Sequence, residues 1–329
     1  MTRPRVVLPL LLAAALFLVA VSLGDLGAVV NRVKQVPVSI MLAALGFAAC
    51  YLFFKGLQLH LLLNDLDAHP GWRRFALAFA IGELALTFPL GVFAQNWVLA
   101  GNKSMHFGRS SAATVVMLIM EVVVALLWLA VAGVPGWPPV RPIAIAILVG
   151  MAMVTFVLLR FDLLERLAGR IRHRGVSRLL AEGVGLLQGL RRLGKWRVFG
   201  INLLITPAYL AALTAAFWVM GHGMGLHALG YAQATTIYAF ALASVLVSGG
   251  VFGQIGLVEV IGMTTAHAGG MGYTSGLALM LGFRLAWTGA MWLLNGTVAV
   301  ALWHSVQMGA AFSTSDQAMQ DDSNRPKRR

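Results

Sequence analysis

The chain has 329 residues, of which 59% are hydrophobic and 11% are charged, and its mean hydropathy is +0.81. Soluble globular chains are about 45–50% apolar and about 25% charged, so this composition excludes an ordinary soluble enzyme and a disordered chain. A single cysteine, Cys50, excludes an intramolecular disulfide and a cysteine-based metal cluster. The sequence therefore predicts an all-α polytopic membrane protein.

The net charge is +13, from 25 Lys and Arg against 12 Asp and Glu. The basic residues lie in short segments between apolar runs, as in cytoplasmic loops that face anionic lipid. This distribution favours membrane lipids over nucleic acid as the partner. Ten of the basic residues lie within residues 160–198, so we expect that segment to be cytoplasmic.

Six apolar runs are long enough to cross a membrane, since a spanning helix needs about 20 mostly apolar residues. These runs are residues 6–23, 36–63, 111–133, 142–160, 199–220 and 276–303. The first run follows Arg3 and Arg5 and lacks a clear small-residue cleavage site. We therefore interpret it as a retained span rather than a signal peptide.

Two further apolar stretches are interrupted near their middles. Residues 75–100 contain Pro89 and Gly91, and residues 228–268 contain a glycine-rich turn at 248–256. Proline removes a backbone donor and glycine loosens a helix, and open backbone at membrane depth is tolerated only against protein or a wet cavity. Each stretch is therefore one broken span or a re-entrant pair of half-helices.

The charge distribution favours the re-entrant alternative. With two re-entrant hairpins and six full spans, the N-terminus, residues 160–198 and the C-terminal tail all lie in the cytoplasm. The first hairpin then enters from the cytoplasm and the second from outside, which is the arrangement of an inverted repeat in a transporter. We expect a single domain over residues 1–310 in the inner (cytoplasmic) membrane.

Two segments are expected outside the membrane core. Residues 161–198 have leucines on one face and arginines on the other, which predicts a basic amphipathic segment on the inner leaflet. Residues 311–329 form a polar and basic tail, which we expect to be disordered.

Ionisable residues inside apolar runs are expensive and are therefore candidates for function. Glu121 lies at the centre of its run, Glu259 follows the glycine-rich turn, and Arg284 lies about two helical turns inside the last run. Glu83 lies in the first interrupted stretch. Lys55 lies nearer the end of its run, and we expect its long side chain to reach the membrane surface.

Two interpretations of these charges remain open. One is a buried ion pair that fixes helix register, formed by Arg284 with Glu121 or Glu259. The other is a binding site in which half-helix N-termini and Arg284 hold a phosphate. On the second interpretation the substrate-binding residues are Pro89, Gly91, Gln95, Asn96, Glu121, Gly253, Gly256, Glu259 and Arg284. Neither a metal-ligand spacing nor a phosphate-binding loop motif is present, so we expect no metal and no cofactor.

The stretch from Gly253 to Glu259, with Phe283-Arg284-Leu285 in the following run, resembles the integral membrane (flippase-like) domain of the lysylphosphatidylglycerol synthetase/flippase family. The resemblance extends over about residues 36–303. Two positions depart from the family pattern: Val122 replaces an arginine, and around Pro89 and Gly91 only Gln95 and Asn96 are polar.

The resemblance implies a stand-alone membrane domain, without the family's aminoacyl-transferase domain, that moves a lipid between leaflets. The implied substrates are an anionic phospholipid or a polyprenyl-phosphate-linked molecule, and a transporter is favoured over an enzyme. One alternative is a membrane transferase acting on a lipid carrier through Asp65-Leu66-Asp67. Another is a non-catalytic partner of an envelope-lipid enzyme, which it would contact through residues 160–198.

Overall fold

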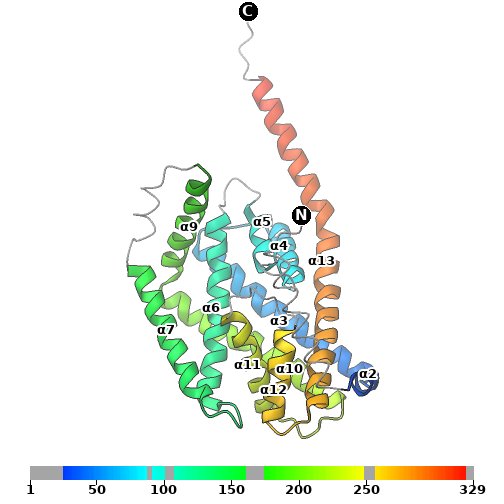
Figure 1. The fold of residues 1–329 in the computed structure, drawn as a ribbon. Coiled ribbons are helices and arrows are strands. Elements are labelled where there is room, and N and C mark those ends of the chain that lie inside the picture. Colours follow the sequence, from blue (N-terminus) through cyan, green and yellow to red (C-terminus); the bar gives the residue numbers. More distant parts are fainter. Residues whose placement is uncertain (1–24, 87–90, 101–106, 161–173, 248–255, 324–329) are drawn as a thin grey trace, which may run out of the picture.

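The computed structural model describes residues 25–86, 91–100, 107–160, 174–247 and 256–323 (Figure 1). Within these ranges the regular structure is helical, which confirms the predicted all-α class. The elements are α2 (Leu26–Lys34), α3 (Val38–Asp65), α4 (Trp72–Ala85), the short 3₁₀ helix η1 (Gly91–Phe93), α5 (Ala94–Ala100), α6 (Phe107–Ala132), α7 (Val140–Arg160), α9 (Arg174–Leu193), α10 (Trp196–Gly223), α11 (Tyr231–Val247), α12 (Leu257–Ala268) and α13 (Tyr273–Ser323).

Four of the described helices are long and apolar enough to cross a membrane, and they confirm four of the predicted spans. They are α3, α6, α10 and the part of α13 as far as Trp303. A fifth predicted span corresponds to α7, which is apolar from Val140 to Thr155. The predicted span at residues 6–23 lies outside the described residues.

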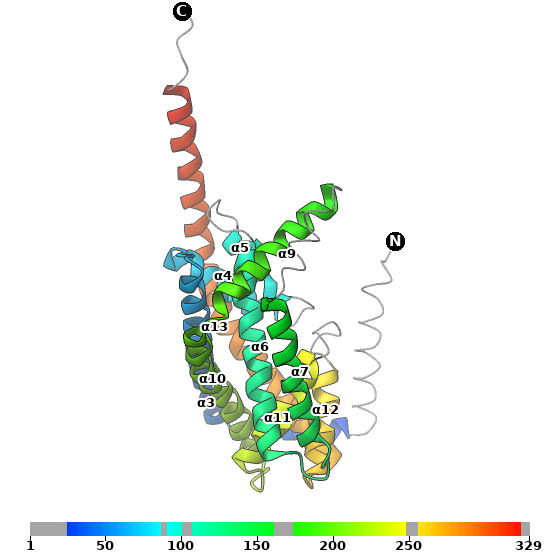
Figure 2. The same ribbon diagram turned by 90° about the vertical axis from the view of Figure 1, so that its left-hand side faces the viewer.

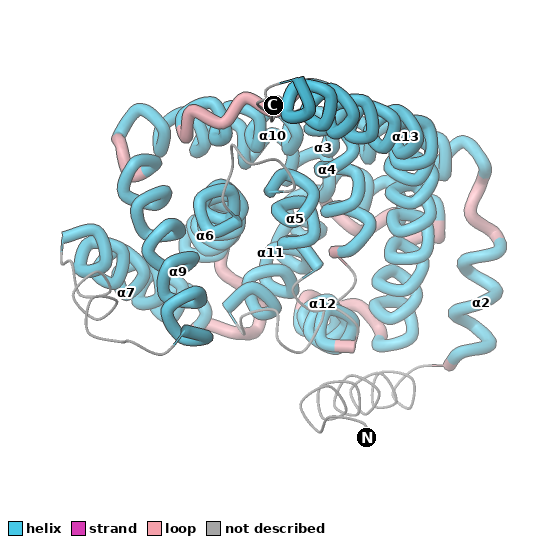
Figure 3. The backbone as a smooth tube through the Cα atoms, turned by 90° about the horizontal axis from the view of Figure 1, so that it is seen from above, coloured by secondary structure: helices cyan, strands magenta, loops and turns pink. Residues whose placement is uncertain are grey.

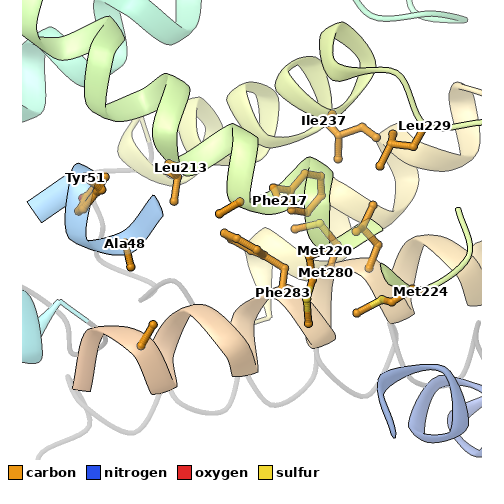
Figure 4. Packing of buried hydrophobic residues seen from close by; sticks show 14 of the residues in the cluster. Ala48, Tyr51, Leu213, Phe217, Met220, Met224, Leu229, Ile237, Met280 and Phe283 are labelled. Carbon is orange, nitrogen blue, oxygen red and sulfur yellow. The ribbon is translucent and has the colours of Figure 1, made fainter. Parts of the chain in front are cut away.

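The long helices α3, α10 and α13 pack through a shared apolar cluster. Figure 4 shows Phe217 of α10 pointing towards Phe283 of α13, and the two rings lie edge to face with centroids 5.1 Å apart. Within the membrane, packing and polar contacts rather than the hydrophobic effect hold helices together. Gln58 of α3 supplies such a contact, because its Nε2 donates to Asn202 Oδ1 at 2.7 Å and to Thr206 Oγ1 at 2.9 Å.

The first interrupted stretch forms two separate short helices, α4 and α5, as predicted. With 14 and 7 residues they are about 21 and 10 Å long, too short to span a hydrocarbon core of about 30 Å. They pack closely, since a β carbon at Gly82 would lie 2.8 Å from Gln95 Oε1. Figure 3 shows α5 near the centre of the molecule, with α6 and α9 to one side and α13 to the other.

The pair α4 and α5 begins and ends at the same end of the molecule. Arg192 Nε of α9 donates to the backbone oxygen of Asp65, where α3 ends, at 2.7 Å. Glu182 of the same helix accepts a hydrogen bond from the backbone N–H of Gly108, at the start of α6, at 2.5 Å. Because both contacts are to α9, the chain between α3 and α6 returns to the end from which it started.

The pair α11 and α12 begins and ends at the opposite end. Gln233, in the first turn of α11, donates to the backbone oxygen of Gly269, directly after α12, at 3.0 Å. Gly136, which follows α6, also lies there, since its β carbon would lie 3.5 Å from the Ala268 oxygen. Figures 1 and 2 show α4 and α5 in the upper half and α11 and α12 in the lower half. The two pairs therefore enter the helix bundle from opposite ends.

The apolar face of α9 differs from its expected position on the lipid. Leu186, Leu190 and Leu193 join the cluster formed by residues of α3, α4, α5 and α6. A β carbon at Gly189 would lie 2.5 Å from the Ala112 side chain, so glycine allows α9 to approach α6 closely. These three leucines of the basic helix therefore pack against protein rather than lipid.

The structure also differs from the sequence analysis at both ends of the described chain. Helix α2 was not expected, and Asp25 caps it by accepting a hydrogen bond from the Ala28 N–H at 3.2 Å. Helix α13 continues to Ser323, beyond the expected end of the membrane domain at residue 310. No proline lies between Tyr273 and Pro326, so no proline ends that helix earlier.

The close approach of α9 to α6 is testable with two glycine positions on the same helix. We expect Gly189→Ala to lower the free energy of unfolding by about 1–3 kcal/mol, because the added methyl overlaps Ala112. Gly183→Ala is the matched control, because a β carbon there meets nothing within 4 Å and alanine favours the helix. Thermal unfolding in detergent compares the two; equal stability would contradict this packing.

Candidate functional site

The inner ends of α4, α11 and α12 line one cavity. Its volume is about 130 Å³, enough for several water molecules, and its walls come from α3, α4, α6, α10, α11, α12 and α13. Leu86 at the end of α4 and Val245 near the end of α11 are both in the lining. Five ionisable residues with opposite charges also line it: Lys55, Glu83, Glu121, Glu259 and Arg284.

Lys55 is buried between two carboxylates and does not extend to the membrane surface, so the expectation for this residue was wrong. Its Nζ lies 3.2 Å from Glu83 Oε1 and 3.3 Å from Glu121 Oε1. The exposed fractions of the three residues are 4%, 7% and 6%. A buried charge is stable only when opposite charges and hydrogen bonds compensate it, and here two acids from neighbouring helices do so.

Two tyrosines complete the surroundings of the lysine. Tyr51 lies four residues before Lys55 on the same helical face, and its hydroxyl accepts a hydrogen bond from Nζ at 2.6 Å. Tyr209 of α10 donates its hydroxyl to Glu121 Oε1 at 3.1 Å. The cluster of Tyr51, Lys55, Glu83, Glu121 and Tyr209 thereby joins α3, α4, α6 and α10 at the cavity.

Glu259 and Arg284 form a second ion pair in the lining. Glu259 is 1% exposed; its Oε1 accepts from Arg284 Nη1, and its Oε2 accepts from the backbone N–H of Gly256 at 2.7 Å. Glu259 thus caps the start of its own helix while it holds the arginine. Gly256 has φ +88, a conformation that favours glycine. The Arg284 side chain is 23% exposed, so it is the more accessible partner.

Of the predicted substrate-binding residues, the structure brings Glu121, Glu259 and Arg284 together at the cavity. Arg284 was expected to pair with Glu121 or with Glu259. In the structure it pairs with Glu259, whereas Glu121 pairs with Lys55. Gly256 lies at the start of α12 beside Glu259, and its N–H is engaged by that side chain rather than open to an anion.

The predicted residues Gln95 and Asn96 lie elsewhere. Gln95 Nε2 and Asn96 Nδ2 both donate to Thr114 Oγ1, at 2.8 and 3.0 Å, and they fix α5 to α6 away from the cavity lining. Packing explains the glycine at position 91, because a β carbon there would lie 1.7 Å from the Ala85 backbone oxygen. Pro89 and Gly253 lie outside the described residues.

Asp65 and Asp67, the acidic pair considered for a transferase, connect the end of α3 to α9. Asp67 pairs with Arg192 of α9, which also donates to the Asp65 backbone oxygen. Asp67 has φ 53, as expected in a tight turn. In the part of the chain that the structure describes, no group of three or more His, Cys, Asp or Glu residues is placed to hold a metal ion.

The predicted substrate-binding set did not include Tyr51, Lys55, Glu83 or Tyr209, although Glu83 was among the charged candidates. One signal for Lys55 and Glu83 was present, since both are charged residues within apolar stretches. The tyrosines carried no such signal, because tyrosine is common in apolar helices and only its hydroxyl partner reveals its role.

The fold and the cavity define a polytopic, all-helical membrane protein with ion pairs around an internal site. Residues 6–296 match the family model described as the lysylphosphatidylglycerol synthase TM region. The match covers most of the sequence, so the chain belongs to this family, as the glycine-rich stretch and Phe283-Arg284-Leu285 indicated. No curated protein matches the chain.

Because Lys55 compensates the charge of two buried carboxylates, its removal should lower the stability of the protein strongly. We expect Lys55→Met to lower the free energy of unfolding by about 3–5 kcal/mol, because it leaves two buried carboxylates without their partner. Adding Glu83→Gln and Glu121→Gln to that variant should restore part of the loss.

Denaturant unfolding in mixed micelles measures the effect, with Lys195→Met as the matched control. Lys195 is exposed at the start of α10, so its loss should change little. A Lys55→Met protein as stable as the control would show that the cluster does not stabilise the fold.

Proposed function

We propose that this protein moves an anionic lipid, or a lipid-linked molecule, between the two leaflets of the cytoplasmic membrane. One observation carries the proposal: two short helix pairs enter from opposite ends, and the inner ends of α4, from the first pair, and of α11 and α12, from the second, line the same charged cavity. Opposed broken helices around a midplane site are the arrangement by which several transporters expose one site to each side in turn.

In this proposal both short pairs are re-entrant. The end of the molecule that carries α9 faces the cytoplasm, because four basic residues lie close together there. They are Arg191, Arg192, Lys195 and Arg197. The pair α4 and α5 then enters from the cytoplasm, and the pair α11 and α12 enters from outside.

The headgroup binds at Arg284. Its guanidinium lines the cavity, is partly accessible and has the planar geometry that suits a phosphate. Glu259 orients it from one side. Trp292 of α13 also lines the cavity and is 54% exposed, so the cavity reaches the lipid-facing surface of that helix. A headgroup enters by this route while its acyl chains stay in the bilayer.

Lipid movement in proteoliposomes tests the proposal. We expect wild-type protein to move a labelled anionic phospholipid or a labelled polyprenyl phosphate, and Arg284→Ala to slow it by at least about tenfold, as loss of one charged contact does. Arg192→Ala is the matched control, because Arg192 pairs with Asp67 away from the cavity. A folded Arg284→Ala protein with full activity, or a folded wild type that moves neither lipid, would contradict the proposal.

Cysteine labelling from each side of the membrane tests the topology, in a Cys50→Ala background. We expect His69→Cys and Lys195→Cys to react from the cytoplasm, and Ala228→Cys and Gly272→Cys to react from outside; all four positions are exposed. Each pair flanks one proposed hairpin, with two further crossings, α6 and α7, between the first two positions. If the members of a pair react from opposite sides, the corresponding hairpin crosses the membrane.

A further inference from the structure

Among the residues that the structure describes, the charged side chains that line the cavity do not balance. Lys55 and Arg284 supply two positive charges, whereas Glu83, Glu121 and Glu259 supply three negative charges when all are ionised. An uncompensated charge in surroundings of low dielectric constant is expensive. The same excess opposes an anionic headgroup, so the site needs one further positive charge.

Glu83 is the least compensated of the three acids. Glu259 engages both of its oxygens, with Arg284 and with the Gly256 N–H. Glu121 receives both Lys55 and the Tyr209 hydroxyl. Glu83 contacts Lys55 through Oε1, and within the described part of the chain its buried Oε2 has no hydrogen-bond partner, in a side chain that is 4% exposed.

We propose that Glu83 is a proton-binding site and that its protonation admits the anionic headgroup to the cavity. A proton taken from water converts the carboxylate to a carboxylic acid, and the charge of the lining rises from one negative to zero. Lys55 then keeps Glu121 as its ionised partner. The new O–H at Glu83 Oε2 is a donor at the cavity wall, where a phosphate oxygen can accept from it.

The control of headgroup binding by this proton rests on the proposed function, whereas the proton-binding site itself does not. The site itself follows from the charge balance and the unpartnered oxygen. Release of the headgroup to the other side lets Glu83 return its proton to water, so one proton accompanies each binding event.

Seven titratable or charged groups of the described residues face or adjoin Glu83 in the cavity. They are Tyr51 and Lys55 on α3, Glu121 on α6, Tyr238 on α11, Glu259 on α12 and Arg284 on α13, with Tyr209 of α10 behind Glu121.

Infrared spectroscopy of the purified protein in lipid nanodiscs tests the proton site without any transport. We expect a protonated carboxyl band at neutral pH that disappears at higher pH, is absent in Glu83→Gln and is retained in Asp67→Asn. Asp67 is the matched control because it is an exposed acid paired with Arg192 outside the cavity. An unchanged band in Glu83→Gln, or a band that appears only when sodium is withdrawn, would overturn the proposal; the second outcome would make sodium the resident cation.

Binding of a short-chain phosphatidylglycerol to the detergent-solubilised protein tests the consequence. For wild type we expect the affinity to fall by up to about tenfold per pH unit as pH rises through the titration of Glu83, as one linked proton requires. Glu83→Gln, which mimics the protonated acid, should bind with the low-pH affinity at every pH. Equal pH dependence in the two proteins, or no binding to wild type at any pH, would overturn the control of headgroup binding by the proton.

The two measurements separate the failures of the two proposals. A carboxyl band that depends on Glu83, in a protein that moves no lipid, would leave the proton site standing and remove the transport function. Lipid movement that is unaffected by pH and by Glu83→Gln would leave transport standing and overturn the role of the proton.

Discussion

The structure depends most on one buried ammonium group shared by two carboxylates. Lys55 of α3 lies within 3.3 Å of Glu83 on α4 and of Glu121 on α6, inside a bundle of mostly apolar helices. Because an isolated charge in such surroundings costs several kcal/mol, the three helices are stable together only when these side chains meet. The lysine therefore fixes the rotation of α3, the depth of the short helix α4 and the face that α6 presents to the cavity.

The second ion pair, between Glu259 and Arg284, also satisfies a backbone N–H group at the start of α12. A helix that begins inside a membrane protein exposes N–H groups that water cannot reach. Glu259 satisfies one of them, at Gly256, and uses its other oxygen to hold Arg284. The requirement for a capped helix start thus places an arginine at the cavity wall, and it explains why a glycine and an acid occur together at the interruption.

Much of the fold follows from local patterns. The lengths of the apolar runs predicted α3, α6, α7, α10 and α13, because crossing the hydrocarbon core sets a minimum length. Pro89, Gly91 and the glycines of 248–256 predicted the two interruptions, because these residues weaken a helix wherever they occur. The same reasoning selected Glu121, Glu259 and Arg284, since a charge in an apolar run is conspicuous without knowledge of its neighbours.

The sequence by itself therefore determined the class of protein, the positions of the long apolar helices and of the two breaks, and three of the charges at the cavity. Only the tertiary structure decided which side chains pair with one another. Lys55 has a side chain long enough to reach the surface, and its burial follows from Glu83 and Glu121, which lie on other helices. Gln95 and Asn96 look like free polar groups until Thr114 is brought against them. A local pattern gives the period of a helix, whereas pairing depends on how helices distant in sequence are rotated against one another, and that is set by packing.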